Sequence, residues 1–512
     1  MKFATLTLVL SWRRTLALLI GFIVAPAISI QGAAPARPNI LLIMPDDVGY
    51  GDYSCLGSPI MKTPAVDAFW KESVRFTQFH FSPTCAPTRS ALLTGRHEFK
   101  NGVTHTINER ERMTLKATTL AQVLKSEGYT TGIFGKWHLG DEDVYQPGRR
   151  GFDEVYIHGG GGIGQTYAGS CGDAPGNNYF DPAIRHNGTF EKTKGYCTDL
   201  FFKQATKWID AQRQGEQPFF AYVALNVAHA PLQCPEENFQ HYEGKVPEMV
   251  AKFYGMLENL DDNFGRLMKQ LKQWGLEENT MVIYLGTDNG GTVGAKIFNA
   301  GLRATKATPY QGGTRGPSFW RWPAGFRGGV DCDALTAHLD IFPTLVEIVG
   351  VSLHDDVKRQ VEGRSLLPLL KNPQATWPDR TLVTHVGRWE RGQSEKAKYS
   401  LCSIQNSRFT LVNNAELYDL KNDPGETKNV IAVHPEVAAK LRSTYDQWWI
   451  DVQPMLVNET AVGPKINPFK EAFWNQFGGG PDAALRKQMD PDAPTEPAGG
   501  SAKSKTKKAD LP

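Results

Sequence analysis

The chain has 512 residues, of which 41% are hydrophobic, so it can bury one large domain and a second, smaller one. Its formal net charge is only +2, from 56 basic and 54 acidic residues. This even balance lacks the basic surface typical of nucleic-acid-binding proteins, and we expect no nucleic-acid partner.

Residues 1–30 are predicted to be a secretory signal peptide. Arg13 and Arg14 precede an apolar run over Leu16–Ile28, and small residues at candidate cleavage sites follow. The run is short and soon reaches proline and glycine, so we expect no stable membrane span after processing. A retained N-terminal anchor is the alternative. The protein is therefore expected to be exported, either periplasmic or secreted.

Four apolar segments of the chain each lead directly into polar residues. Such short, continuous apolar runs are typical of strands buried on both faces, and helical or long segments separate them. In open α/β sheets ligands bind at the carboxyl edge, so the polar residues that follow should share one site. The segments are Ile40–Met44, Thr130–Phe134, Phe219–Leu225 and Met281–Leu285.

Acidic and amide side chains follow the first and the last of these segments. Asp46 and Asp47 come directly after one, and Asp288 and Asn289 come after the other. Three carboxylates and an amide form a hard-oxygen set that suits Ca²⁺ or Mg²⁺. The alternative is that adjacent carboxylates only start a turn. No spacing of histidines and cysteines indicates zinc.

A cysteine, a helix start and an arginine lie together in the segment 82–96. Pro87 allows a helix to begin there but hardly earlier, and Gly95 can end it. Cys85 then precedes a helix N-terminus, where free N–H groups favour negative charge, and Arg89 lies one turn further. These residues predict a site for an anion. The alternative is a buried structural cysteine.

The glycine-rich segment Gly159–Gln165 could be taken for a phosphate-binding loop, but no Gly-Lys-Ser/Thr follows it. We expect instead an irregular insertion at the rim of the site, with a plain surface loop as the alternative. Six cysteines remain besides Cys85. Cys171 and Cys197 could pair across this insertion, although the sequence alone does not decide the pairing.

From about Trp377 the pattern changes to short β-prone runs, followed by a helix over about Glu436–Trp449. This pattern predicts a small antiparallel sheet with a helix packed on it. His385 and Arg388 near its start are candidate substrate contacts, with an exposed loop as the alternative. The end of the chain, from about Gly478, is rich in Pro, Gly and Lys and should be disordered. The predicted strand runs are 382–385, 399–404, 409–412 and 415–420.

Motifs spread over most of the chain resemble those of the sulfatase family, in the family's order. Thr88 stands where many members carry Ser, and Gln311 departs from the usual Glu, which puts only the local loop contacts in doubt. The motifs are Asp46-Asp47, Cys85-Ala-Pro-Thr-Arg89 with Leu93-Thr-Gly-Arg96, Gly135-Lys-Trp-His-Leu-Gly140, Gly151-Phe-Asp153, His229-Ala-Pro231, Thr287-Asp-Asn-Gly-Gly291, and Lys306 ahead of Tyr310-Gln-Gly-Gly313 and Arg315.

This resemblance implies an alkaline-phosphatase-like α/β domain over 37–375, with a mixed, mostly parallel sheet between helices. It also implies a small C-terminal α+β subdomain with an antiparallel sheet over 376–457, which leaves 458–512 as an extension with a disordered tail. The implied reaction is the hydrolysis of sulfate esters, on sulfated carbohydrates or aryl sulfates. The nucleophile would be formylglycine (3-oxoalanine), which a formylglycine-generating enzyme makes from Cys85.

The resemblance also implies roles for individual residues. It places Arg89 and Lys136 on formylglycine, and His138 near its second hydroxyl. It places His229 and Lys306 by the leaving-group oxygen. It assigns one Ca²⁺, or alternatively Mg²⁺, to a formylglycine oxygen at position 85 and to the side chains of Asp46, Asp47, Asp288 and Asn289.

Two alternative functions remain open at this point. A phosphate mono- or diester hydrolase of the same superfamily is one, because the same metal ligands and nucleophile tolerate phosphorus. The other is a non-catalytic, sulfoglycan-binding relative in which Cys85 stays unconverted. The full set of acid–base and metal residues argues against the second, since binding alone has no use for a nucleophile and two histidines.

Overall fold

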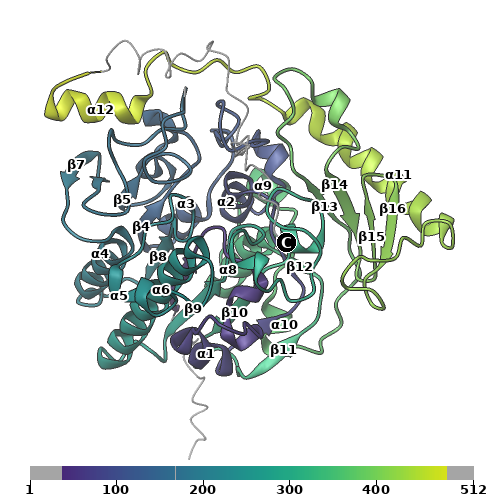
Figure 1. The fold of residues 1–512 in the computed structure, drawn as a ribbon, viewed down its shortest axis with the longest axis horizontal. Helices are drawn as coiled ribbons and strands as arrows, with labels where there is room; N and C mark the ends of the chain where they lie inside the picture. Colours follow the sequence, from purple (N-terminus) through teal and green to yellow (C-terminus); the bar gives the residue numbers. More distant parts are fainter. Residues whose placement is uncertain (1–36, 168, 481–512) are drawn as a thin grey trace, which may run out of the picture. The chain divides into compact units, whose positions relative to one another are not determined.

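The computed structural model describes residues 37–167 and 169–480 (Figure 1). The predicted signal peptide and the last part of the predicted disordered tail lie outside these residues. A ten-stranded sheet organises the larger part, in the order β11-β2-β10-β9-β1-β8-β4-β5-β6-β7. Its strands are β1 (Asn39–Met44), β2 (Val74–Phe76), β4 (Thr130–Lys136), β5 (Glu154–His158), β6 (Ala183–His186), β7 (Thr189–Lys192), β8 (Phe219–Ala224), β9 (Thr280–Leu285), β10 (Ser318–Arg321) and β11 (Val330–Cys332).

The centre of this sheet is parallel and its edges are mixed. Strands β9, β1, β8, β4 and β5 pair in parallel, whereas β10 pairs antiparallel with β9 on one side and β6 pairs antiparallel with both β5 and β7 on the other. The predicted mixed, mostly parallel sheet is thereby confirmed. Since β9, β1, β8 and β4 are neighbours with one direction, their carboxyl ends meet at one edge. A separate two-stranded pair consists of β3 (Phe79–His80) and β12 (Thr336–Ala337).

Helices cover both faces of the large sheet. Successive side chains of a strand point to opposite faces, so Ile40 and Leu42 join the core beneath α2, α3 and α8, and Leu41 and Ile43 join the core beneath α1, α4 and α6. The helices of this part are α1 (Pro64–Lys71), α2 (Cys85–Thr94), α3 (Leu120–Ser126), α4 (Cys197–Gln212), α5 (Glu236–Gln240), α6 (Glu248–Gln273), α7 (Gln311–Thr314), α8 (Ile341–Val349), α9 (Asp355–Gln360) and α10 (Leu367–Lys371).

A four-stranded antiparallel sheet follows, which the sequence predicts, and its strands lie in the order β13-β14-β15-β16. The helix α11 (Pro435–Val452) packs on β14 and β15, and Leu441, Tyr445 and Trp449 share a core with Ile404 and Leu411 (Figure 1). This matches the predicted small α+β subdomain. Its strands are β13 (Leu382–His385), β14 (Cys402–Gln405), β15 (Phe409–Val412) and β16 (Glu416–Asp419).

The residues after this subdomain add one more helix, α12 (Pro468–Phe477), which lies beside β7. No helix within 37–167 and 169–480 is both long enough and apolar enough to cross a membrane. All seven cysteines fall in these described ranges, and each is a free thiol. Cys171 and Cys197 therefore do not form the disulfide that the sequence left open.

Candidate active site

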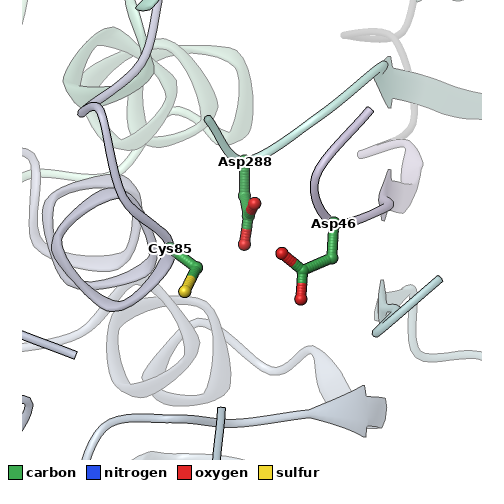
Figure 2. Close-up of side chains that lie close together, drawn as sticks. All are labelled: Asp46, Cys85 and Asp288. Atoms are coloured by element: carbon green, nitrogen blue, oxygen red, sulfur yellow. The ribbon is translucent and has the colours of Figure 1, made fainter. Parts of the chain in front are cut away.

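The candidate catalytic residues meet at the carboxyl edge of the parallel strands. Asp46 follows β1, Asp288 follows β9, and Cys85 begins α2 on one face of the sheet. One ligand atom from each of these three side chains lies within 4.8 Å of the other two (Figure 2). All three residues are buried. The predicted convergence of strand-end carboxylates with the cysteine is thus present in the structure.

Cys85 is the first residue of α2, two residues before the predicted helix start at Pro87. The helix tolerates Pro87 because the first four N–H groups of any helix lack partners within it. Burial by itself would raise the pKa of the Cys85 thiol, but the ammonium groups of Lys136 and Lys306 lower it below its ordinary value. The site therefore favours negative charge at position 85.

Three carboxylates at the site each form an ion pair with one cationic side chain. The pairs are Lys136–Asp46 at 2.6 Å, Arg89–Asp288 at 2.7 Å and Lys306–Asp47 at 2.5 Å. The Arg89 guanidinium also donates to the carbonyl oxygens of Lys136 and Leu225, each at 3.1 Å. With its side chain 1% exposed, Arg89 holds Asp288 and two strand ends in place.

Two oxygens at the site have no hydrogen-bond partner among the described residues. Asp46 Oδ1 and Asn289 Oδ1 are both buried and unpartnered, and the Asn289 amide donates to Asp288. Burial and the nearby Asp288 carboxylate raise the pKa of Asp46 well above its ordinary value. A divalent cation would satisfy these oxygens and relieve the repulsion between the carboxylates, so the donor set fits such an ion.

The two candidate histidines have opposite tautomers. His138 donates from Nε2 to the carbonyl oxygen of Thr106 at 2.7 Å, so its buried, unpartnered Nδ1 is a proton acceptor. His229 donates from Nδ1 to the carbonyl oxygen of Ala230 at 2.8 Å, and its Nε2 lies 3.9 Å from Asp47. Burial lowers the pKa of both rings, that of His229 to about 4, so both are neutral at pH 7.

The glycine-rich segment packs directly on both histidines. A Cβ atom at Gly161 would lie 2.5 Å from the His138 ring, and one at Gly162 would lie 2.5 Å from His229 Nδ1. Only glycine allows this approach, since real Cβ contacts are not that short. The segment therefore forms part of the site, as the rim interpretation of the sequence predicts.

A cavity of about 140 Å³ opens beside Cys85. His138, His229 and Lys306 line it, whereas Arg89 and Lys136 are buried and do not. Its lining also includes His105, Gln165 and Tyr167, to which the sequence analysis gave no individual role. Gln165 ends the glycine-rich segment, so the rim interpretation pointed to it. No sequence motif distinguishes His105 or Tyr167.

Comparison with known proteins identifies the family. A model described as Sulfatase matches residues 38–351, and one described as N-sulphoglucosamine sulphohydrolase, C-terminal, matches residues 305–448. Human (Homo sapiens) arylsulfatase A is 31% identical over 465 residues, which cover 80% of this chain and 88% of that protein. Arylsulfatase J of Mus musculus is 32% identical over 338 residues, but these cover only 65% of this chain and 55% of that protein.

The chain belongs to the sulfatase family. Among solved structures, this sulfatase resembles Ps i-CgsB in complex with k-i-k-neocarrahexaose, with a TM-score of 0.72 and 26% identity over 86% of this chain and 97% of that one. The phosphonate monoester hydrolase of Agrobacterium radiobacter, at 20% identity and a TM-score of 0.55 over 82% and 96% of the two chains, shares the fold. The predicted alkaline-phosphatase-like fold class is confirmed.

The two candidate substrate contacts of this sulfatase, Arg388 and His385, lie in different surroundings. Arg388 lines the cavity. His385 does not line it and is 1% exposed. Its Nδ1 accepts from the Gly387 N–H at 2.9 Å, and its Nε2 donates to the Ala397 carbonyl oxygen at 3.0 Å. The His385 ring packs against Phe99, Trp389 and Trp449, away from the cavity lining, so the structure gives no support for His385 as a substrate contact.

Proposed function

We propose that this sulfatase hydrolyses sulfate esters of saccharides through a formylglycine formed from Cys85 and one divalent cation. The observation that carries the proposal is the grouping of Cys85 with Asp46 and Asp288 within 4.8 Å, in a buried site with unpartnered acceptor oxygens. The chain's membership of the sulfatase family supports sulfate ester hydrolysis as the reaction class.

Asp46, Asp47, Asp288 and Asn289 are the side chains proposed to hold the cation, with Ca²⁺ expected and Mg²⁺ as the alternative. Once bound, the cation would withdraw negative charge from the sulfate oxygens. The protein contributes the geometry, because Lys136, Arg89 and Lys306 fix the three carboxylates. Chelation followed by dialysis should abolish turnover, and adding back Ca²⁺ or Mg²⁺ should restore it; chelated protein with full activity would contradict the proposal.

Formylglycine at position 85 would supply, as its hydrate, one hydroxyl for attack on sulfur and a second for expulsion of sulfate. The neutral His138 ring lines the same cavity and has a free acceptor at Nδ1. It is therefore suited to take a proton from a hydroxyl at residue 85. General base catalysis of this kind contributes about 10²–10⁴-fold to a rate.

His229 and Lys306 are proposed to serve the leaving-group oxygen. Both line the cavity beside Cys85, and both contact Asp47. Burial alone would raise the pKa of the Asp47 carboxyl, but Lys306 and His229 lower it below its ordinary value. The pKa of Lys306 is raised, so its ammonium carries a proton at neutral pH. Lys306 can thus deliver a proton to the leaving oxygen, and the neutral His229, whose proton is on Nδ1, is proposed to help position that oxygen.

The proposed substrate class is a sulfated saccharide. One supporting relative is the N-acetylgalactosamine-6-sulfatase of Rattus norvegicus, which is 26% identical over 449 residues covering 78% of this chain and 82% of that protein. The signal-like residues 1–30 support export to the periplasm or the medium. The intact Cys-x-Pro-x-Arg core supports maturation by a formylglycine-generating enzyme. Sequencing the mature N-terminus after cell fractionation tests export.

The decisive experiment combines mass and rate. The Cys85 peptide of active protein should be lighter than the unmodified peptide by the difference between CH₂SH and CHO, and aryl sulfate should turn over faster than aryl phosphate. Cys85→Ser should stall with a covalent sulfate, because a single hydroxyl can accept sulfate but cannot expel it by forming a carbonyl. An unmodified Cys85 peptide from fully active enzyme would overturn the mechanism, and a preference for aryl phosphate would overturn the reaction.

A further inference from the structure

Two side chains that line the catalytic cavity have no part in the chemistry described above. These are His105, in the loop before α3, and Arg388, in the loop after β13. They come from the large sheet's part of the chain and from the small subdomain, respectively. Each is oriented by hydrogen bonds that leave hydrogen-bond donors free.

The tautomer of His105 follows from its backbone contacts. Its Nδ1 accepts hydrogen bonds from the N–H groups of Thr106 at 2.8 Å and Ile107 at 3.1 Å. Burial, Arg110 and Arg388 together lower the pKa of His105 well below its ordinary value, so the ring is neutral. A neutral ring with an accepting Nδ1 must carry its proton on Nε2. No residue of the described chain accepts that Nε2–H.

Arg388 is exposed, and its backbone is anchored while its guanidinium forms no ion pair among the described residues. Its N–H donates to the carbonyl oxygen of Thr104 at 3.1 Å, and its guanidinium donates to Thr106 Oγ1 at 3.1 Å. No carboxylate within the described ranges pairs with it. Two neighbouring arginines differ in this respect, because Arg391 pairs with Glu109 at 3.2 Å and Arg110 with Glu459 at 3.6 Å.

The loop that carries Arg388 is closely fitted to the loop that carries His105. Gly387 has φ 67°, and a Cβ there would lie 1.9 Å from the Thr104 carbonyl oxygen, so only glycine fits. His385 fixes the same turn by accepting the Gly387 N–H. The backbone that carries Arg388 and the His105 ring are therefore held in place before a ligand arrives, which reduces the cost of ordering these two parts on binding.

We propose that Arg388 and His105 bind a second anionic group of the substrate, a carboxylate or a second sulfate, so that the preferred substrate is a sulfated saccharide with two anionic groups. The inference rests on the proposed function, since the first anion is the sulfate ester at residue 85. A guanidinium and a neutral imidazole N–H are both donors without acceptor capacity at those atoms. They can donate to any oxygen acceptor, but the positive charge of the guanidinium makes its hydrogen bonds to an anion stronger than those to a neutral oxygen, and it repels a cation.

The kinetic test uses matched substrates built on a sulfated disaccharide of hexosamine and uronic acid. The monosulfated free acid is compared with its methyl ester, and the monosulfated methyl ester with the disulfated methyl ester. Each pair then sets one anionic group against two, and the two pairs separate the carboxylate from the second sulfate as the recognised group. Wild type should prefer the dianionic member of at least one pair. Arg388→Gln should lower that preference, measured as a ratio of kcat/KM, by about tenfold to hundredfold, mainly through KM. Arg388→Lys should restore part of it.

Two further variants complete the test. His105→Asn keeps an acceptor oxygen near the Nδ1 position and removes the Nε2–H, so it should lower the same ratio by a smaller factor. Arg149→Gln is the control, because Arg149 forms an exposed pair with Asp143, with side chains 70% and 69% exposed, and should leave the ratio as in wild type. A wild type without preference, or an Arg388→Gln variant with an unchanged ratio, would overturn the inference.

Binding to the Cys85→Ala protein gives a readout that does not depend on turnover. Calorimetric titration with the same disaccharide pairs should give a lower Kd for the dianionic member, and the additional Arg388→Gln change should abolish that difference. Retention of this binding difference in a wild-type protein that hydrolyses no sulfate ester would reject the proposed function and support the inference. Turnover of sulfate esters without any binding difference would support the proposed function and reject the inference.

Discussion

At the scale of single residues, the site is a set of paired charges rather than isolated ligands. Each of Asp46, Asp47 and Asp288 combines a proposed metal-binding role with an ion pair to a lysine or arginine. A substitution at any of them therefore changes two interactions. Removing one partner of a buried pair leaves the other charge uncompensated, at a cost of about 3–5 kcal/mol.

Asp288→Ala should therefore lose both turnover and stability. Its Arg89 partner is 1% exposed and would keep its charge without a carboxylate, so the free energy of unfolding should fall by about 3–5 kcal/mol. Asn289→Ala is the matched variant, because it removes a neutral ligand whose Oδ1 has no other described partner. It should lose turnover at a smaller cost in stability. Urea unfolding and initial rates measure both; equal stability of Asp288→Ala and wild type would contradict this account of Arg89.

His229→Ala should affect substrates unequally. If His229 serves the leaving oxygen, esters with poor, alcohol-like leaving groups should lose far more rate than activated aryl sulfates, which need little protonation. The measurement is kcat/KM for a series of sulfates graded by leaving-group pKa, and the slope against that pKa should steepen in the variant. Equal losses across the series would assign the leaving oxygen to Lys306 instead.

At the scale of elements, the site depends on where strands and helices end. Cys85 lies in the first turn of α2. Asp46 and Asp288 follow the carboxyl ends of the neighbouring strands β1 and β9. The glycine-rich segment after β5 then closes over both histidines. Its glycines act through the space that they leave for the imidazole rings.

Gly162→Ala should lower turnover with little change in the global fold. The added methyl group would stand 2.5 Å from His229 Nδ1, so the ring or the segment must shift. A displacement of about 1 Å at a catalytic group can cost on the order of 10²-fold in rate. Gly148→Ala is the control, because a Cβ there meets nothing within 4 Å. Wild-type kcat in Gly162→Ala would show that His229 does not need this position.

At the scale of the whole molecule, the residues after the small subdomain bind back to loops of the large sheet. Asn458 donates to the carbonyl oxygens of Gly102 and Arg112, and Asn467, which caps α12, donates to Asp141 at 2.6 Å. Gly172 also donates to Asp141, at 2.7 Å. The extension thus secures the loops around the cavity from a distance of more than 300 residues along the chain.

Burial raises the pKa of Asp141 to about 8, which makes this contact pH-dependent. The folded pKa exceeds the unfolded value, so the stabilisation is present at low pH and is lost as the pH rises from about 4 to about 8. Asp141→Asn, which cannot ionise, should gain Tm relative to wild type between pH 5 and pH 8. The difference between the two proteins is the relevant measure, because buried histidines such as His158, with a pKa of about 3, favour the opposite trend in both. A Tm difference between the two proteins that does not change with pH would contradict the raised pKa of Asp141 in the folded protein.

Much of this protein is determined locally and was therefore predictable. Apolar runs such as Ile40–Met44 specify buried strands because water excludes them wherever they lie, and the residue after each strand must emerge at the sheet edge. The family motifs likewise named Cys85, Asp288 and Lys306, since chemistry constrains short stretches of sequence.

Only the tertiary structure decided which of these residues face the substrate. Arg388 and His105 line one cavity although 283 positions separate them, whereas His385, three residues before Arg388, is turned into the subdomain core. The helix start at Cys85 and the free thiols of Cys171 and Cys197 likewise depended on packing. The physical reason is that a side chain's direction at the end of a strand depends on the partner loop that packs against it, and that partner lies far away in the sequence.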